Sequence, residues 1–132
     1  MNKNFDDWNK IKQKIQNDNL KVGFKNRDIF YMKMGKNIGY EQDGKGEEFV
    51  RPVLILKGFN KDVFLGIPLS TKIKEGIFYF TFKFIKNDKM IINNALLSQI
   101  RLFSTKRLLN KIGIINKNDF EDLKIKFKAL ID

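Results

Sequence analysis

Residues 39–71 read GYEQDGKGEEFVRPVLILKGFNKDVFLGIPLST, and two apolar segments within this stretch decide how the chain folds. Residues 50–56 and 63–69 each have the length and the apolar composition of a buried strand. Residues 58–62 between them contain Gly, Asn and Asp, which favour a tight turn. Because Pro52 has no backbone N–H, it belongs at the start of its strand or on a sheet edge. The stretch therefore predicts a β-hairpin.

Polar side chains gather at one end of this predicted hairpin. Arg51 enters the first strand, and Ser70 and Thr71 leave the second, so antiparallel pairing brings them to the same end. A glycine-rich loop that carries Glu41 and Gln42 precedes the first strand. These side chains form the candidate functional site. Each also has a simpler interpretation as a solvated strand end or loop residue, and the sequence alone leaves both interpretations open.

Three further segments have the composition of strands, with turn residues beside them: residues 29–34, 77–85 and 95–103. Apolar residues at helical spacing predict an amphipathic helix at 4–16 and a final helix at 119–131, which Asn116 or Asn118 caps. A short helical turn is expected at 106–111. Short strands joined by short turns favour a mainly β (α+β) fold, a small barrel with N-terminal and C-terminal helices, over a doubly wound α/β fold.

The composition fits one globular domain with a strongly basic surface. The 132 residues include 26 Lys and Arg against 15 Asp and Glu, which gives a formal net charge of +11. Such a charge favours a polyanionic partner, with nucleic acid first and an acidic protein or an anionic membrane next. The lysines are spread along the chain, so a soluble basic surface without a specific partner is the alternative.

Cysteine and histidine are absent, and their absence excludes several kinds of active site. The chain cannot build a thiolate or imidazole zinc site, a disulfide, or a nucleophile activated by histidine. Any catalysis must therefore use carboxylates, arginine, lysine, tyrosine, hydroxyls or backbone groups. No apolar run reaches the length of a membrane span, and residues 2–19 are too polar for a signal peptide, so we expect a cytoplasmic protein.

Four sequence blocks occur in the order typical of one protein family. The blocks are GYEQDG at 39–44, VRPVLIL at 50–56, GIPLST at 66–71 and LLSQIRLFSTKRLLNKIG at 96–113. Together with a C-terminal helix, this ordered set resembles the MazF/PemK toxins of bacterial type II toxin–antitoxin systems. The resemblance covers about residues 27–131, and the order of the blocks carries it rather than any single block.

The resemblance implies an SH3-like small β-barrel of the CcdB-MazF type that acts as a homodimer. It also implies an endoribonuclease that needs no metal ion or other cofactor and cuts single-stranded RNA, often mRNA, at short sequences. A cognate antitoxin protein would block this activity. Under this interpretation the chain is a single MazF/PemK-like domain, with residues 1–22 as a helical N-terminal extension and residues 27–131 as the barrel and the last helix.

The resemblance also assigns roles to residues of the candidate site. Arg51 aligns with the family's catalytic arginine, and Ser70, with Thr71 beside it, occupies the place of a catalytic threonine. Glu41 and Gln42 align with a Glu-Gln pair in the family's loop, although the loop between Glu41 and Arg51 is longer here than usual. The expected catalytic residues are thus Arg51, Ser70, Thr71 and Glu41, and the expected RNA-binding residues are Gln42, Lys72, Gln99 and Arg101.

The chemistry of RNA cleavage gives an independent argument for these roles. If the 2′-OH of the RNA attacks the adjacent phosphorus, the protein must stabilise extra charge on the phosphoryl oxygens and move protons. The planar guanidinium of Arg51 suits two phosphate oxygens, and Ser70 or Thr71 would donate a hydroxyl to them. Glu41 is the loop carboxylate placed to act as a base. Two alternatives remain open: a non-enzymatic CcdB-like toxin that binds a protein target such as gyrase, and an inactive RNA-binding domain.

Overall fold

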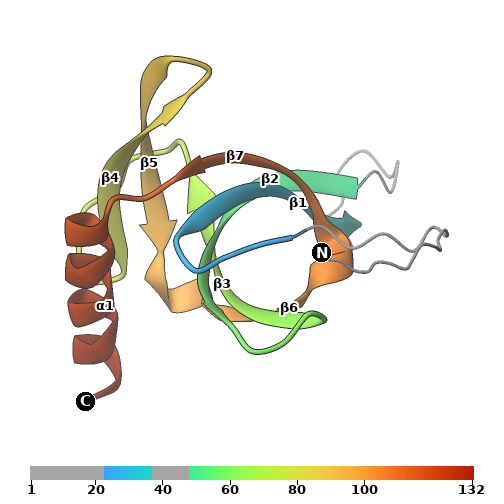
Figure 1. Cartoon of the computed structure of the whole chain (residues 1–132). Coiled ribbons are helices and arrows are strands. Elements are labelled where there is room, and N and C mark those ends of the chain that lie inside the picture. The colour runs from blue at the N-terminus through green and yellow to red at the C-terminus, as the bar shows by residue number, and fades with distance from the viewer. Residues whose placement is uncertain (1–22, 37–47) are drawn as a thin grey trace, which may run out of the picture.

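The structure is a computed structural model that describes residues 23–36 and 48–132 (Figure 1). These residues form seven strands, two short 3₁₀ helices and one α-helix. The strands are β1 (Asp28–Lys36), β2 (Glu48–Gly58), β3 (Val63–Ser70), β4 (Tyr79–Lys86), β5 (Lys89–Leu96), β6 (Arg101–Ser104) and β7 (Leu108–Ile114). The 3₁₀ helices are η2 (Leu97–Gln99) and η3 (Thr105–Arg107), and the α-helix is α1 (Lys117–Ile131).

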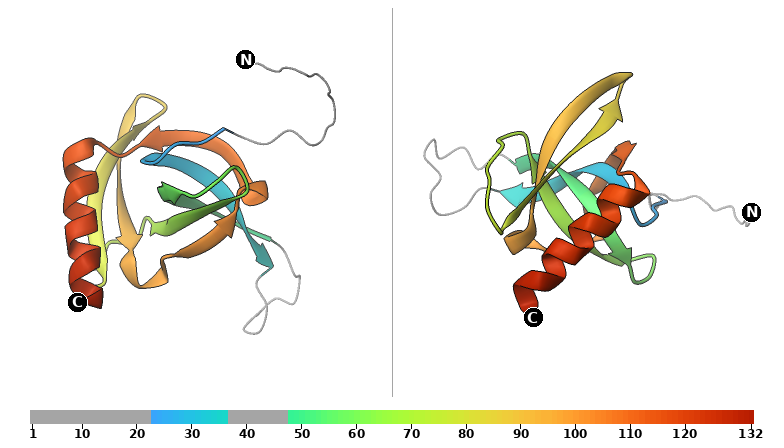
Figure 2. Two further views of the ribbon diagram at one scale, coloured as in Figure 1. Left: turned by 60° about the horizontal axis from the view of Figure 1, so that its bottom comes forward. Right: turned by 90° about the vertical axis from the view of Figure 1, so that its left-hand side faces the viewer.

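The strand pairs are antiparallel, and the strands lie in the order β4-β5-β3-β2-β1-β7, with β6 paired to β3. The sheet curls into a small barrel, the β4–β5 hairpin extends beyond it, and α1 lies beside β4 (Figures 1 and 2). The expected mainly β fold with a small barrel and a C-terminal helix is therefore confirmed. The helix expected at 4–16 lies outside the described residues.

Two apolar clusters lie on opposite faces of the central strand β2, because successive residues of a strand point to opposite sides. The helix-side cluster contains Leu54 and Leu56 of β2 and Phe120 and Leu123 of α1, together with apolar residues of β1, β3, β4 and β5. Burial on both faces explains why β2 reads as a nearly continuous apolar run. The β6-side cluster consists of Phe30, Met32, Val53, Ile55, Phe64, Phe103 and Leu108.

Most of the predicted elements are present, with small shifts at their ends. The strands expected at 29–34, 50–56, 63–69 and 77–85 correspond to β1, β2, β3 and β4. Asn116 rather than Asn118 caps α1, because its side-chain Oδ1 accepts a hydrogen bond from the Asp119 backbone N–H at 2.7 Å. Pro52 pairs with β1 and lies one residue before the ladder to β3 begins, so β2 is an edge strand on that side at this point.

Two of the predictions for the later part of the chain are wrong. The single strand expected at 95–103 is broken by η2 into the end of β5 and the short strand β6. The helical turn expected at 106–111 is present only at its start, as η3, and residues from Leu108 onward form β7. β7 pairs with β1, which is distant in sequence, and Leu108 lies opposite Met32. Such long-range pairing decides the conformation of a segment, and local composition does not reveal it.

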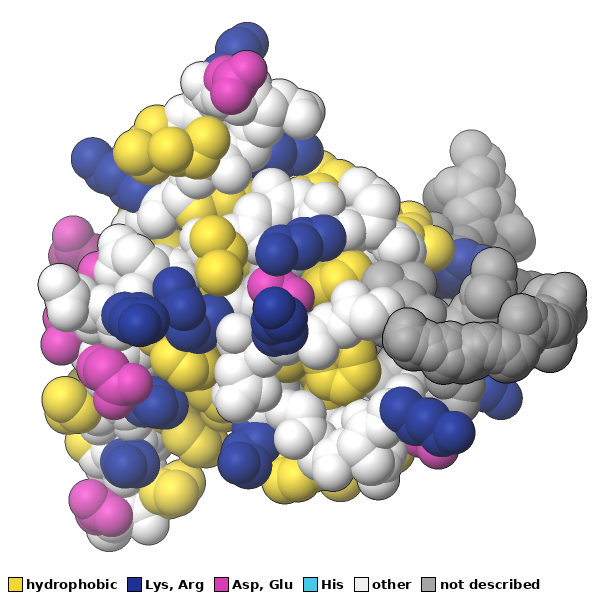
Figure 3. All heavy atoms as spheres, in the orientation of Figure 1, with side chains coloured by type: hydrophobic (Ala, Val, Ile, Leu, Met, Phe, Trp, Pro, Cys, Tyr) yellow, Lys and Arg dark blue, Asp and Glu magenta, His cyan; other side chains and the backbone are white. Residues whose placement is uncertain are grey.

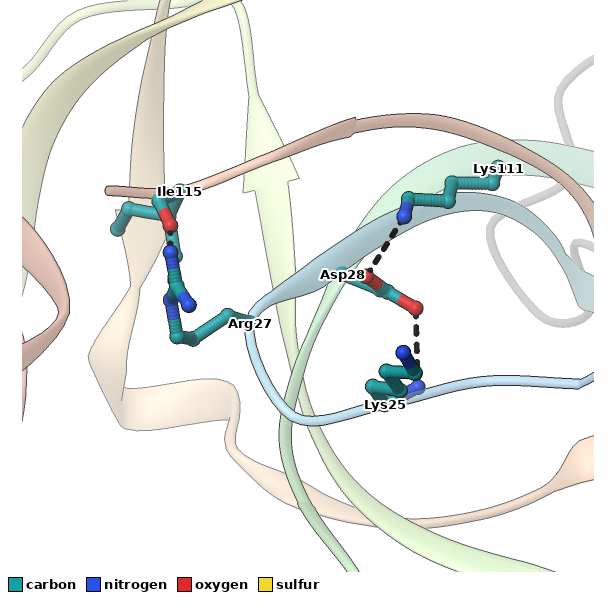
Figure 4. Close-up of polar contacts among 5 residues, drawn as sticks. All are labelled: Lys25, Arg27, Asp28, Lys111 and Ile115. Carbon is teal, nitrogen blue, oxygen red and sulfur yellow. Dashed lines mark hydrogen bonds and ion pairs between the residues drawn. The ribbon is translucent and has the colours of Figure 1, made fainter. Parts of the chain in front are cut away.

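Polar contacts join the start of β1 to the end of β7, a junction that we call the β1–β7 seam (Figure 4). The buried Asp28 carboxylate accepts a hydrogen bond from the Lys25 backbone N–H at 2.9 Å and forms an ion pair with the Lys111 ammonium at 3.0 Å. Arg27 has a φ of 83°, and its Nε donates to the Ile115 carbonyl at 3.1 Å. These contacts hold together two strands that lie far apart in the sequence.

Candidate nucleic-acid interface

The β2–β3 hairpin brings Arg51 and Ser70 to the same end of the barrel. The β2–β3 pairing ends with Val53 opposite Pro68, and Arg51 and Ser70 each lie two residues beyond that last pair, at the same end of the hairpin. On its other side Arg51 lies opposite Met32 of β1. Val53 and Pro68 are opposite each other and share a face, and strand alternation assigns Arg51 and Ser70, two residues further on, to that same face of the β6-side cluster. The expected hairpin is thus present, and its register gathers a cation and a hydroxyl on one face.

Arg51 is only partly exposed, and its guanidinium makes no ion pair or hydrogen bond with any residue that the structure describes. A partly buried cation without a carboxylate partner favours an anion from solution, because the pairing replaces solvation that burial has removed. A guanidinium also presents a planar set of donors that matches two oxygens of one phosphate. Arg51 is therefore suited to hold a phosphodiester group.

The Ser70 hydroxyl is oriented by the loop that follows β3. Its Oγ accepts a hydrogen bond from the Lys72 backbone N–H at 3.1 Å. A hydroxyl also carries one proton of its own, so this proton stays available for a phosphate oxygen. Thr71 and Lys72 follow directly, and both side chains are exposed. The end of β3 therefore presents hydroxyl donors and a cation to a ligand.

A pocket of about 230 Å³ lies on the same face, close to the end of the hairpin. Apolar side chains and polar side chains both line it: Met34, Pro68, Ile100 and Phe103, and Ser98, Gln99 and Arg101. The Arg101 guanidinium lies over the Phe103 ring, 4.8 Å from its centroid, and this contact holds the long side chain against the wall. Gln99 and Arg101 therefore line the same pocket, Gln99 from the end of η2 and Arg101 from the start of β6.

A β-bulge places Met34 in this pocket. The β1–β2 register shifts between Lys33 and Gly35, so Met34 is the extra residue of β1. Bulges redirect side chains and are common beside functional sites. Because Arg51 lies in β2, between the strands that contribute Met34 and Pro68, the pocket and the candidate phosphate site are neighbours.

A residue that sequence reasoning missed holds the loop after Ser70 in place. Asn94 of β5 is fully buried and lies opposite Ser70 in the β3–β5 pair. Its Oδ1 accepts a hydrogen bond from the Thr81 hydroxyl at 3.0 Å. Its Nδ2 donates to the carbonyl of Lys74 at 3.1 Å and to that of Lys72 at 3.4 Å. The signal in the sequence is a pair of adjacent asparagines inside an otherwise apolar strand.

Some of the expected features lie beyond what the structure can place. Glu41 and Gln42 lie outside the described residues. Within residues 23–36 and 48–132, no three His, Cys, Asp or Glu side chains gather as a metal site would require. In the same part of the chain, no helix has both the length and the apolar character needed to cross a membrane.

Positive charge is widely distributed over the face of the molecule in Figure 3. Lys and Arg side chains there are scattered among apolar and acidic ones and do not form one continuous patch. The attraction for a polyanion is therefore spread over this face, as the even distribution of lysines in the sequence predicts. The charge by itself marks no single binding site on this face.

A family model described as PemK-like, MazF-like toxin of type II toxin–antitoxin system matches residues 25–131. The chain belongs to this toxin family. The matched region of this MazF/PemK-family toxin includes all seven described strands and α1, and the architecture agrees with the small β-barrel that the resemblance implied. Membership in the family implies an antitoxin partner. A sequence comparison with curated proteins gave no match.

Proposed function

We propose that this MazF/PemK-family toxin is a sequence-specific, metal-independent endoribonuclease that cleaves single-stranded RNA, including mRNA. The observation that supports the proposal best is that Arg51 and Ser70 lie at the same end of the hairpin, each two residues beyond the Val53–Pro68 pair. Beside them lies a pocket of about 230 Å³, which has room for one planar base. A phosphate site next to a base site is the arrangement that cleavage at a chosen nucleotide requires.

In the proposed reaction, the 2′-OH of one nucleotide attacks the adjacent phosphorus, and the 5′-oxygen of the next nucleotide leaves. The products are a 2′,3′-cyclic phosphate and a 5′-hydroxyl end. Charge develops on the two non-bridging oxygens in the transition state. The Arg51 guanidinium pairs with these oxygens and the Ser70 hydroxyl donates to one of them, and a well-placed donor of this kind contributes about 3–4 kcal/mol.

Proton transfer needs a further group, since an arginine side chain stays protonated at any pH that the protein tolerates. We assign to Glu41 the role of the base that takes the proton of the 2′-OH, and water supplies the proton that the departing 5′-oxygen takes up. We assign a contact with RNA to Gln42, and both residues belong to the loop outside the described residues. Thr71 supplies the second hydroxyl of the proposed catalytic set. Lys72, which is exposed beside it, binds a neighbouring phosphate as a point charge.

The pocket provides a place for an unstacked base beside the phosphate to be cut. Proteins read single-stranded RNA by packing its bases on flat side chains and by bonding to the base edges. Met34, Pro68 and Phe103 offer apolar contact, and the Gln99 amide offers both a donor and an acceptor. Arg101, which lies flat on Phe103, adds a cationic surface on which a base can stack.

The proposal includes the assembly in which such a toxin would act. We propose a cytoplasmic homodimer and a single functional domain, with residues 1–22 as an extension to the barrel. The antitoxin that the family implies would carry an acidic segment, because a net charge of +11 attracts one. Such a segment would cover the basic RNA site and block it.

The proposal is tested with the purified protein, a long and weakly structured RNA, EDTA, and the Arg51→Ala variant in parallel. We expect cuts at one short sequence, with 2′,3′-cyclic phosphate ends, that EDTA does not prevent and that Arg51→Ala does not make. Intact RNA that still binds the protein would indicate an RNA-binding domain instead. Intact RNA without binding would indicate a protein target, and either of these results rejects the ribonuclease.

A further inference from the structure

We infer that Asn94 is a positioning residue for the cleavage reaction. Its side chain fixes the conformation of the loop at 71–76 and, through that loop, the orientation of the Ser70 hydroxyl. This inference rests on the proposed function. Asn94 is 0% exposed, so it contacts no substrate itself. Its effect must reach the reacting phosphate through the residues that it holds.

A chain of hydrogen bonds runs from β4 through Asn94 to Ser70. The Thr81 hydroxyl donates to the Asn94 Oδ1 at 3.0 Å, which fixes the orientation of the amide. The Nδ2 of Asn94 then faces the loop, where it donates to the carbonyls of Lys74 at 3.1 Å and Lys72 at 3.4 Å. The backbone N–H of Lys72 in turn donates to the Ser70 Oγ at 3.1 Å. Lys72 is thus held at its carbonyl by Asn94 and holds Ser70 by its N–H.

The loop depends on this anchor because its own side chains bury little. Every side chain from Thr71 to Glu75 is exposed, with the apolar Ile73 at 49%, so the segment gains little packing energy that would select one conformation. The amide of Asn94, by contrast, is buried and satisfied, and buried polar networks of this kind specify a unique local structure. Loss of the hydrogen bonds from Asn94 would let the backbone at Lys72 rotate. The Ser70 hydroxyl would then lose the hydrogen bond from the Lys72 N–H that orients it.

The neighbouring residue offers a matched control. Asn93 is 1% exposed and is therefore as buried as Asn94, but it points to the opposite face of β5. Its Oδ1 has no hydrogen-bond partner among the described residues, and no bond from its side chain reaches the loop there. Replacing Asn93 changes a buried amide of the same kind without releasing the loop.

The test measures single-turnover cleavage at saturating protein and, separately, the Kd for the same RNA. Asn94→Leu keeps the approximate size of the side chain and removes the donors. We expect it to slow cleavage about 10- to 100-fold, because small displacements of reacting groups have effects of this size. Binding should weaken less than the rate does, because the loop loses its fixed position but keeps the charge of Lys72, and the position of Arg51 does not depend on the loop. Asn93→Leu should leave both quantities within about twofold of the unmodified toxin, because the loop stays anchored.

A double-mutant cycle with Ser70→Ala separates positioning from general destabilisation. If Asn94 acts through the Ser70 hydroxyl, Asn94→Leu should slow the Ser70→Ala protein less than about twofold. Thr81→Val is a second variant, at an exposed strand position of β4 where valine is tolerated. The substitution removes the hydrogen bond from the Thr81 hydroxyl that orients the Asn94 amide, and it should slow cleavage by about threefold or more.

The outcomes distinguish the two proposals. If Asn94→Leu and Thr81→Val both cleave RNA as fast as the unmodified toxin, the positioning role of Asn94 is overturned and the proposed ribonuclease function stands. An equal slowing of both backgrounds by Asn94→Leu also overturns it, because the loss would then not pass through Ser70. Failure of the unmodified toxin to cleave RNA rejects the proposed function, and the inference falls with it.

Discussion

The guanidinium of Arg51 lies on a sheet face whose other side chains are mainly apolar, and it has no partner among the described residues. In such a setting the shape of the cation matters as well as its charge. A planar fork binds two oxygens of one phosphate at once, whereas a lysine ammonium acts as a single compact charge. Under the proposed function, the residue at this position would therefore affect the geometry of a bound phosphate.

Arg51→Lys tests this role of shape. We expect the variant to bind RNA with nearly unchanged affinity and to cleave it about 10- to 100-fold more slowly, because the charge remains and the second donor is lost. Single-turnover kinetics on an RNA with one cleavage site measure the difference. Arg101→Lys is the comparison, and it should alter base preference more than rate. Full activity of Arg51→Lys would contradict the two-oxygen contact.

Gly66 lies where three side chains of the β6-side cluster converge. An added Cβ would come within 2.7 Å of the Phe64 ring, 2.9 Å of a Val53 methyl and 3.0 Å of the Phe103 ring. We expect Gly66→Ala to lower the free energy of unfolding by about 1–3 kcal/mol, as overpacking does, and urea unfolding measures it. Gly23→Ala is the control, since nothing lies within 4 Å of its added Cβ. An equal loss in both variants would show that the close approach at Gly66 is not the cause.

At the scale of elements, α1 depends on one capping contact. The Asn116 Oδ1 accepts a hydrogen bond from the Asp119 backbone N–H at 2.7 Å and satisfies a donor that the helix itself leaves free. We expect Asn116→Ala to destabilise the protein by about 1 kcal/mol in urea unfolding. Asn118→Ala replaces an exposed asparagine inside α1, where alanine is a better helix former, and should not destabilise. A similar loss in Asn118→Ala would argue against the cap.

Local signals were sufficient for some elements and not for others. The β2–β3 hairpin was predictable because two apolar runs flank a tight turn, and the antiparallel pairing then brought Arg51 and Ser70 to the same end. β7 was not predictable, because its partner β1 lies far away in sequence and its exposed residues lack a clear apolar period. The role of Asn94 was hidden for a similar reason, since it depends on the β3–β5 pairing and on carbonyls of a loop. Sequence patterns report local pairing well and distant pairing poorly.

At the scale of the whole molecule, the net charge of +11 and its scattered distribution on the face in Figure 3 would give the proposed RNA substrate two kinds of contact. Long-range attraction would raise the local concentration of RNA around the protein and would weaken with salt. Among the described residues, cations near the end of β3, such as Lys72, are placed to contact a phosphate at the proposed site and to release its counterions. Lysines far from the site would contribute the long-range attraction alone.

The salt dependence of binding distinguishes these lysines. We expect Lys72→Gln to reduce the slope of log affinity against log salt by about 0.7, the contribution of one phosphate contact on a single strand. Lys128→Gln removes another exposed charge, from α1, which lies beside β4, and should leave the slope unchanged. Fluorescence anisotropy with a labelled uridine oligonucleotide at several salt concentrations gives both slopes. Equal slopes for the two variants would remove Lys72 from the site.

The β1–β7 seam has a consequence for how the toxin is made. It joins Arg27 to Ile115, which are 88 positions apart, so the barrel closes only after nearly the whole matched region has left the ribosome. Contacts between such distant residues form late in folding, because the intervening chain must first be ordered. A nascent chain that has not yet reached β7 therefore has no closed barrel to support the proposed site. Under the proposed function, translation of the toxin's own mRNA could therefore be completed before the newly made protein was able to cleave it.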